Sequence, residues 1–208
     1  MSHEGSLEAD GIRLRYGEAG QGTALVHLPG PGELRLTTAH DLLARRHRVI
    51  VFETPAGDRA PAALASTLGR AITSLGIAQF NLMGTALGGT TALELAIGAP
   101  ERVLALVLEA PVAIRPRGGE PGDAELERRL AELTTPTLAL FGTDDTVIPP
   151  ETGRRYPELL ANGHLVFVYA AAHAISADRP EAFAEVVLDF LERHEAFIIS
   201  RTGTVIHP

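Results

Sequence analysis

Three short segments of this chain are almost entirely apolar: RVIVFE at 48–53, VLALVLE at 103–109 and TLALF at 137–141. Patterns typical of helices separate them. A strand that is apolar on both faces must be covered on both sides, and sheets built from such strands are mostly parallel. We therefore predict an α/β fold with a mostly parallel, twisted sheet and helices on both faces.

The remaining elements are predicted from the spacing of apolar residues. In the segment 61–75, Leu64, Leu68, Ile72 and Leu75 recur at intervals of three and four residues, which places them on one face of a helix. Other helices are expected at 36–46, 87–97, 123–133 and 179–194, and other strands at 11–16, 23–28, 79–83 and 165–169. Strands and helices thus alternate along nearly the whole chain.

The size and charge of the chain limit the number of domains and the kinds of partner that we expect. Its 208 residues are 45% hydrophobic, which is enough for one core and too few for two ordinary domains, so we expect a single domain over 1–208. The formal net charge of −8 disfavours nucleic acid as a partner. Apolar runs of about seven residues are far short of the ~20 that span a bilayer. No signal-peptide pattern is found at 1–10, so we expect a cytoplasmic protein without a membrane partner.

The chain contains no cysteine, which excludes disulfides, thiolate catalysis and cysteine-based metal sites. Its eight histidines do not recur at the spacing of metal ligands. The glycine-rich segment 84–89 lacks both the Walker lysine and the dinucleotide fingerprint. We therefore expect no metal and no cofactor.

The segment NLMGTALGG at 81–89 reads as a strand that passes through a tight turn into a helix. With Gly84 and Gly88 around Ala86, it resembles the nucleophile elbow of the α/β-hydrolase superfamily, G-x-S-x-G, with alanine in the serine position. The resemblance implies that the backbone N–H of Leu87 faces the oxyanion hole. The alternative is a glycine-rich strand–helix junction without a catalytic history.

Two later segments extend this resemblance. LALFGTDDTVIP at 138–149 is similar to the strand and loop that carry the triad acid in this superfamily, with Asp145 in the position of the acid and Asp144 as the alternative. VYAAAHAISADRP at 168–180 is similar to the loop of the catalytic histidine, and His173 is the match. The order elbow, acid, histidine is the order of the superfamily.

The resemblance implies a role for each residue. His173 would act as a general base whose tautomer and orientation are fixed by Asp145. Ala86 carries a methyl group that has no proton to give, so no acyl-enzyme can form there. Thr85 and Thr90 bring hydroxyls nearby, but Thr85 precedes the elbow residue and is expected to point away from the reacting side.

The resemblance covers about residues 10–194 and has two departures. The oxyanion loop usually reads His-Gly, whereas this chain has HLPGPG at 27–32. If Gly30 takes the donor position its N–H serves, whereas Pro31 would have none to donate. The usual Asp-x-Pro-Gly after the next strand is replaced by ETPAG at 53–57.

A short insertion at about 111–136 stands where the superfamily places its cap. With 26 residues the cap is slight, so we expect an open pocket, or one that a second chain completes in a homodimer. The expected lining is apolar, which favours a small, mostly apolar ligand or an ester-like substrate. The residues named for it are Pro31, Leu34, Leu87, Val112, Ile114, Val147 and Ile148. The C-terminal extension at 197–208 is expected to form a hairpin, and the alternative is an edge strand supplied to a partner.

Three functions stay open at this stage. In the first, the natural protein is a serine esterase or related hydrolase and alanine was introduced at position 86. In the second, the chain is a pseudoenzyme that uses the old pocket for binding or regulation. In the third, His173 and Asp145 act as a base dyad without a nucleophile, in lyase-like or cofactor-free oxygenase chemistry.

Overall fold

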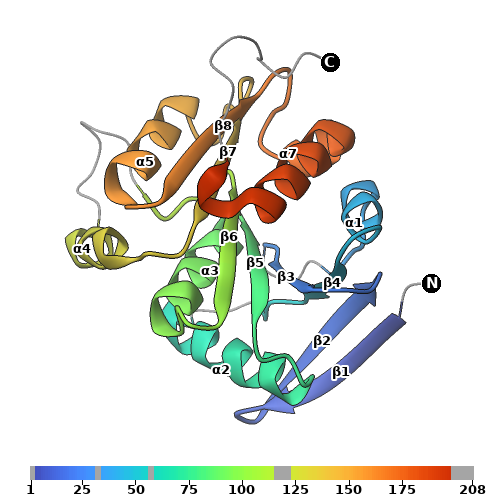
Figure 1. Ribbon diagram of the computed structural model, residues 1–208. Coiled ribbons are helices and arrows are strands. Elements are labelled where there is room, and N and C mark those ends of the chain that lie inside the picture. The colour runs from blue at the N-terminus through green and yellow to red at the C-terminus, as the bar shows by residue number, and fades with distance from the viewer. Residues whose placement is uncertain (1–2, 31–33, 56–58, 115–122, 198–208) are drawn as a thin grey trace.

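The computed structural model (Figure 1) describes residues 3–30, 34–55, 59–114 and 123–197. Eight strands form one sheet in the order β1-β2-β4-β3-β5-β6-β7-β8. The six strands from β4 to β8 in that order run parallel to one another, and β2 is antiparallel to both of its neighbours. The strands are β1 (His3–Ala9), β2 (Ile12–Ala19), β3 (Ala24–Leu28), β4 (Arg48–Phe52), β5 (Phe80–Thr85), β6 (Val103–Glu109), β7 (Thr137–Gly142) and β8 (Gly163–Val168).

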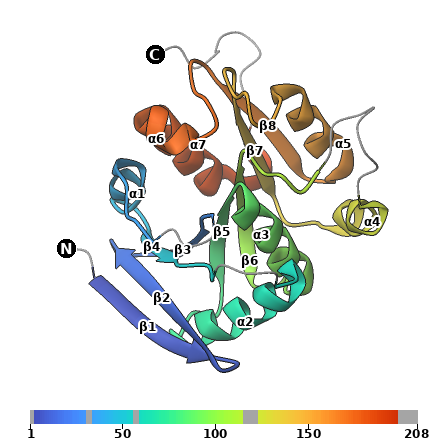
Figure 2. The ribbon, with the colours of Figure 1, turned by 180° about the vertical axis from the view of Figure 1, so that it is seen from behind.

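Helices cover the two faces of the sheet, as the two opposite views in Figures 1 and 2 show. One hydrophobic cluster joins the sheet to α2, α3, α4 and α5, and a second joins it to α1, α6 and α7 on the other face. The helices are α1 (Thr38–Leu43), α2 (Pro61–Ser74), α3 (Leu87–Gly98), α4 (Ala124–Glu132), α5 (Tyr156–Leu159), α6 (Ile175–Asp178) and α7 (Pro180–Arg193). None of these described helices has the length and apolar character needed to cross a bilayer.

The strand β6 explains why its sequence is apolar throughout. Leu106 and Leu108 pack in the cluster on one face of the sheet, and Ala105 and Val107 pack in the cluster on the other. All four side chains are fully buried. The predicted mostly parallel sheet with helices on both faces is confirmed.

The strand β1 was not predicted. Its sequence HEGSLEA is mostly polar, and its burial pattern shows Ala9 alone as buried. It lies at the edge of the sheet and pairs antiparallel with β2 along its whole length, from His3 opposite Glu18 to Ala9 opposite Ile12. An edge strand needs few apolar residues, so no apolar periodicity marks it.

The described part of the expected cap segment forms a crossover helix between two parallel strands. Asp123 caps α4 by accepting hydrogen bonds from the N–H groups of Glu125 and Leu126, both at 3.0 Å. Leu126 and Leu130 are buried in the core beneath the helix. Residues 115–122 and the expected C-terminal hairpin beyond residue 197 lie outside the described residues.

Candidate active site

The turn between β5 and α3 holds Ala86 in a strained conformation. Its φ of 49° and ψ of −116° lie outside the regions that alanine adopts freely. The N–H of Ala86 donates to the carbonyl of Glu109 at 3.0 Å, and the N–H of Gly89 donates to the carbonyl of Ala86 at 3.1 Å. The chain therefore keeps the geometry of an elbow although a methyl group stands at its tip.

Two glycines let the elbow fit against its surroundings. A Cβ at Gly88 would lie 2.0 Å from the carbonyl oxygen of Leu28 at the end of β3. A Cβ at Gly84 would lie 2.7 Å from the Cβ of Ala92 in α3. Both approaches are closer than van der Waals contact, so any side chain would push the elbow away from the sheet or the helix.

We expect Gly88→Ala to lower the free energy of unfolding by roughly 1–3 kcal/mol or more, because the new methyl group collides with backbone. Gly98→Ala is the matched control at the other end of α3. It meets nothing within 4 Å and should change stability by about 1 kcal/mol at most, in the stabilising direction. Urea unfolding of both variants measures this. Equal stability of the two would contradict the tight fit at Gly88.

The start of α3 provides a donor for an oxyanion. The first N–H groups of a helix have no partner within the helix and lie at the positive end of its dipole, and Leu87 is the first residue of this twelve-residue helix. Gly30 ends the described part of the β3 loop, and its carbonyl accepts a bond from the Thr54 hydroxyl at 3.1 Å. Pro31 lies outside the described residues, so the assignment of Gly30 as second donor stays a prediction.

The carboxylate of Asp145 lies in contact with His173. Its Oδ2 accepts from the His173 Nδ1 at 2.9 Å, and its Oδ1 accepts from the N–H groups of Val147 and Ile148 at 2.7 and 2.9 Å. The Asp145 side chain is fully buried, whereas that of His173 is 29% exposed. This arrangement fixes the imidazole through Nδ1 and leaves Nε2 for a ligand.

Asp144, the alternative acid, is placed differently. Its side chain is exposed and accepts a hydrogen bond from the hydroxyl of its neighbour Thr143 at 3.0 Å. Its backbone N–H donates to the carbonyl of Ala171. The geometry therefore favours Asp145 as the partner of His173.

Glu109, which the sequence analysis did not single out, joins the elbow to the histidine loop. It is the last residue of β6 and is 1% exposed. Its carboxylate accepts from the Thr85 hydroxyl at 2.8 Å, from the Ser176 N–H at 2.6 Å and from the Ser176 hydroxyl at 3.1 Å. A charged residue at the end of an otherwise apolar strand was the signal in the sequence that could have identified it.

Two buried histidines continue this network. The Nε2 of His27 lies 2.9 Å from the Thr85 hydroxyl, and its Nδ1 lies 2.8 Å from the Nε2 of His40. Thr85 thus turns its hydroxyl into the network, away from the tip of the elbow. Burial lowers the pKa of His27 well below 6.5, with a smaller contribution from the charge of His40. Burial also lowers the pKa of His40 to about 4, against a small opposing effect of Asp41.

These two histidines make stability depend on pH. The unfolded chain takes up protons near pH 6.5 and the folded chain does so at lower pH, so the free energy of unfolding falls as the pH drops below 6.5. The loss between pH 7 and pH 5 is about 2 kcal/mol for each histidine. In His40→Gln, urea unfolding at the two pH values should show a loss that is about 2 kcal/mol smaller than that of the unmodified chain. The same loss in both proteins would contradict the low pKa of His40.

A cavity of about 210 Å³ lies beside the elbow. Its lining consists of Thr54, Pro55, Arg59, Pro61, Leu64, Leu87, Gly88, Thr90 and Thr91. Leu87 was expected there, and its side chain is 58% exposed. Arg59 adds a positive charge that the predicted uncharged lining did not include.

The other expected lining residues lie in different settings. Ile114 packs in the hydrophobic core and is 3% exposed. Val147 is 63% exposed just after Asp145, while Ile148 and Leu34 are partly buried against the two core clusters. Val112 is also partly buried. Their contact with a ligand stays a prediction.

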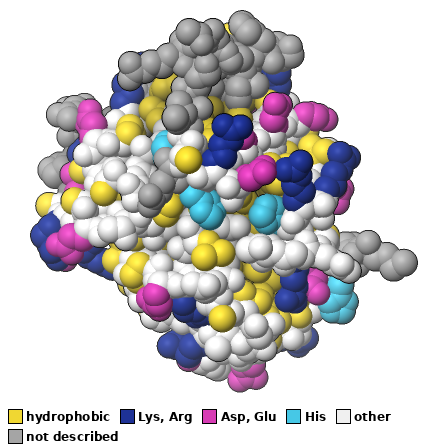
Figure 3. All heavy atoms as spheres, in the orientation of Figure 1, with side chains coloured by type: hydrophobic (Ala, Val, Ile, Leu, Met, Phe, Trp, Pro, Cys, Tyr) yellow, Lys and Arg dark blue, Asp and Glu magenta, His cyan; other side chains and the backbone are white. Residues whose placement is uncertain are grey.

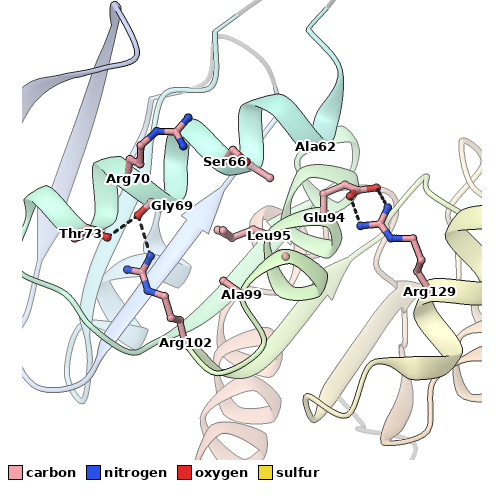
Figure 4. A pocket seen from close by; sticks show the side chains of 12 residues that line it. Ala62, Ser66, Gly69, Arg70, Thr73, Glu94, Leu95, Ala99, Arg102 and Arg129 are labelled. Atoms are coloured by element: carbon pink, nitrogen blue, oxygen red, sulfur yellow. Dashed lines mark hydrogen bonds and ion pairs between the residues drawn. The ribbon is translucent and has the colours of Figure 1, made fainter.

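A second cavity, of about 400 Å³, lies between α2 and α3 and is lined by arginines that already have partners (Figure 4). Arg102 donates to the carbonyls of Gly69, Ile77 and Ala78. Arg129 pairs with Glu94 through both of its terminal nitrogens. These guanidinium groups hold the helices together, so the cavity offers little free charge for a ligand.

One face of the molecule is shown in Figure 3, and acidic and basic side chains are interspersed on it with histidines among them. Hydrophobic side chains lie between these charges. A mixed surface of this kind does not favour a polyanion on that face.

Solved structures of similar fold cover almost the whole chain. A membrane phospholipase A described as a bacterial virulence factor matches with a TM-score of 0.82 at 20% identity, over 92% of this chain and 86% of that chain. An α/β-hydrolase enzyme from the sediment metagenome of the Mar Chica lagoon in Morocco matches with a TM-score of 0.75 at 22% identity, over 92% of this chain and 99% of that chain. The chain has the α/β-hydrolase fold.

One relative by sequence is named as a hydrolase. The protein named "Putative carbamate hydrolase RutD" in Pseudomonas savastanoi pv. phaseolicola is 27% identical over a match of 220 residues, and the match covers 72% of this chain and 85% of that protein. No protein-family model matches the chain. The solved structures and this relative together show that the chain has the α/β-hydrolase fold and is related to hydrolases.

Proposed function

We propose that this chain performs acid–base chemistry on a small carbonyl compound without forming a covalent intermediate. One observation carries the proposal: the Asp145–His173 pair is intact at 2.9 Å although the elbow presents a methyl group at Ala86. A histidine oriented in this way retains its basicity when the nucleophile is absent. Kinship to hydrolases supports the same reaction class.

The reaction can be written with the residues in place. The Nε2 of His173 takes a proton from a water molecule, whose oxygen attacks the carbonyl carbon of the substrate. The N–H of Leu87 donates to the oxygen that becomes negative. Collapse of the tetrahedral intermediate breaks the bond to the leaving group, and His173 returns its proton there. Water thus takes the place that a serine hydroxyl holds in the related serine hydrolases.

The pocket beside the elbow supports a small and largely apolar substrate. At about 210 Å³ it has room for a short acyl or alkyl group, and Pro55, Pro61 and Leu64 give it apolar walls. Ester-like compounds that combine such a group with an activated carbonyl are the class to test first.

A second candidate function is ligand binding without turnover. The loop departures at 27–32 and 53–57 favour it, because they alter the part of the site that would hold the second oxyanion donor. Thr54 donates to the carbonyls of Pro29 and Gly30, which ties these two loops together. Binding of a ligand requires neither a nucleophile nor a complete oxyanion hole.

We expect Ala86→Ser to gain hydrolysis of p-nitrophenyl acetate by roughly 100-fold or more, since removal of a triad serine costs far more than that. The serine should also be labelled by a fluorophosphonate, with the adduct mapped to residue 86 by mass spectrometry. The matched control is Ala86→Ser combined with His173→Ala, which should lose both. Failure of the single variant to gain either would favour the ligand-binding function.

We expect the unmodified chain to hydrolyse activated esters slowly without being labelled. His173→Ala should abolish this turnover and Asp145→Asn should reduce it by about 10-fold or more, because the imidazole loses its orientation. Steady-state kinetics with p-nitrophenyl acetate measures both effects. Turnover that survives His173→Ala would refute the general-base proposal. No labelling is expected at residue 86, because the methyl group of alanine cannot be acylated.

A further inference from the structure

A buried chain of hydrogen bonds runs beneath the elbow, and its direction can be derived. A backbone N–H can only donate, and the N–H of Thr37 lies 3.0 Å from the Nδ1 of His40. The Nδ1 of His40 is therefore an acceptor. Because His40 is neutral near pH 7, its proton lies on Nε2, which donates to the Nδ1 of His27 at 2.8 Å.

The same reasoning assigns the donor and the acceptor of each hydrogen bond from His27 to Glu109. With Nδ1 as an acceptor, neutral His27 holds its proton on Nε2 and donates to the Thr85 hydroxyl at 2.9 Å. Thr85 then donates its own proton to the Oε2 of Glu109 at 2.8 Å. Each donor from Thr37 to Thr85 therefore points toward the carboxylate of Glu109, and bonds aligned in this way strengthen one another.

Glu109 receives donors from a second side. The Ser176 N–H donates to its Oε1 at 2.6 Å and the Ser176 hydroxyl donates to its Oε2 at 3.1 Å. Burial raises the pKa of Glu109. The hydrogen bonds from Ser176 and Thr85 and the charge of His173 act in the opposite direction and lower this pKa. Donors to both oxygens match an ionised carboxylate, which accepts bonds and donates none.

The carboxylate of Glu109 interacts electrostatically with His173, because the charge of His173 lowers the pKa of Glu109. Ser176, which accounts for two of the hydrogen bonds to Glu109, follows His173 by three residues and lies in the short helix α6. Among the described residues, the other carboxylates tied to the loop of His173 are Asp145, on the Nδ1 of His173, and exposed Asp178, which accepts from the N–H of Ala172. Glu109 thus adds a negative charge from the side of β6 and the elbow.

We propose that Glu109 is a positioning residue whose negative charge stabilises the protonated form of His173, and that the hydrogen-bond chain through His40, His27 and Thr85 keeps Glu109 ionised. This inference rests on the proposed general-base function of the same site. Two carboxylates then act on one imidazole, Asp145 through a hydrogen bond and Glu109 through space. A base that must take a proton directly from water gains from both.

The direct test is the titration of His173 by NMR in the full chain, with ring-labelled histidine and with the resonance assigned by its loss in His173→Gln. Glu109→Gln keeps the shape and removes the charge, and the pKa of His173 should fall by about one unit, a tenfold loss of proton affinity. Asp178→Asn is the matched control, a carboxylate on the same loop but in solvent, and its effect should be less than a third as large. An unchanged pKa in Glu109→Gln, or an equal fall in both variants, would overturn the inference.

A second pair of variants tests the hydrogen-bond chain and does not depend on the stability of Glu109→Gln. Thr85→Val removes the hydroxyl that links His27 to Glu109, and Thr85→Ser retains it. The pKa of His173 should fall in the valine variant and stay within about 0.2 units in the serine variant. Equal values in the two would refute the role of the chain.

The titration is independent of turnover, so the two proposals fail separately. A fall of the His173 pKa in Glu109→Gln together with an absence of esterase activity in the unmodified chain would support the inference and reject the proposed function. Turnover that depends on His173 together with an unchanged pKa would do the reverse.

Discussion

The candidate site depends on one buried carboxylate. Glu109 ends the central strand β6, accepts the N–H of Ala86 with its backbone carbonyl, and receives three side-chain or loop donors with its carboxylate. A buried carboxyl group is costly unless its oxygens are hydrogen-bonded, and these donors reach both of its oxygens. The elbow, the histidine loop and the sheet are thereby held at fixed positions relative to one another.

Much of the fold follows from the sequence because burial leaves a direct mark on it. Fully apolar strands such as β6 predicted the parallel sheet, and the apolar face of α2 predicted a covering helix. The edge strand β1 escaped because pairing at an edge is a matter of backbone hydrogen bonds, which polar residues satisfy equally well. The segment at 111–136 was expected to be a cap, whereas its described helix α4 covers the sheet.

The site was predicted as far as its residues belong to local motifs. Ala86 and Asp145 each lie in a segment that has a recognisable order of strand, turn and glycine, and His173 lies in a loop that follows a strand. Glu109 and His40 carry no such motif, and the oxyanion-loop motif at 27–32 does not reveal what His27 binds. Their partners are distant in the sequence: His27 reaches Thr85 across 58 residues and Glu109 reaches Ser176 across 67. Such contacts form only when the chain folds, so the local sequence around each residue does not reveal them.

The strained backbone at Ala86 has a consequence for substitutions at this position. A conformation of this kind costs a residue with a Cβ about 1–3 kcal/mol, and glycine would relieve most of that strain. The chain has kept a side chain on the turn instead. Alanine and serine codons can differ by a single base, so a chain with serine at this turn lies one nucleotide away, on a backbone that already carries a side chain there.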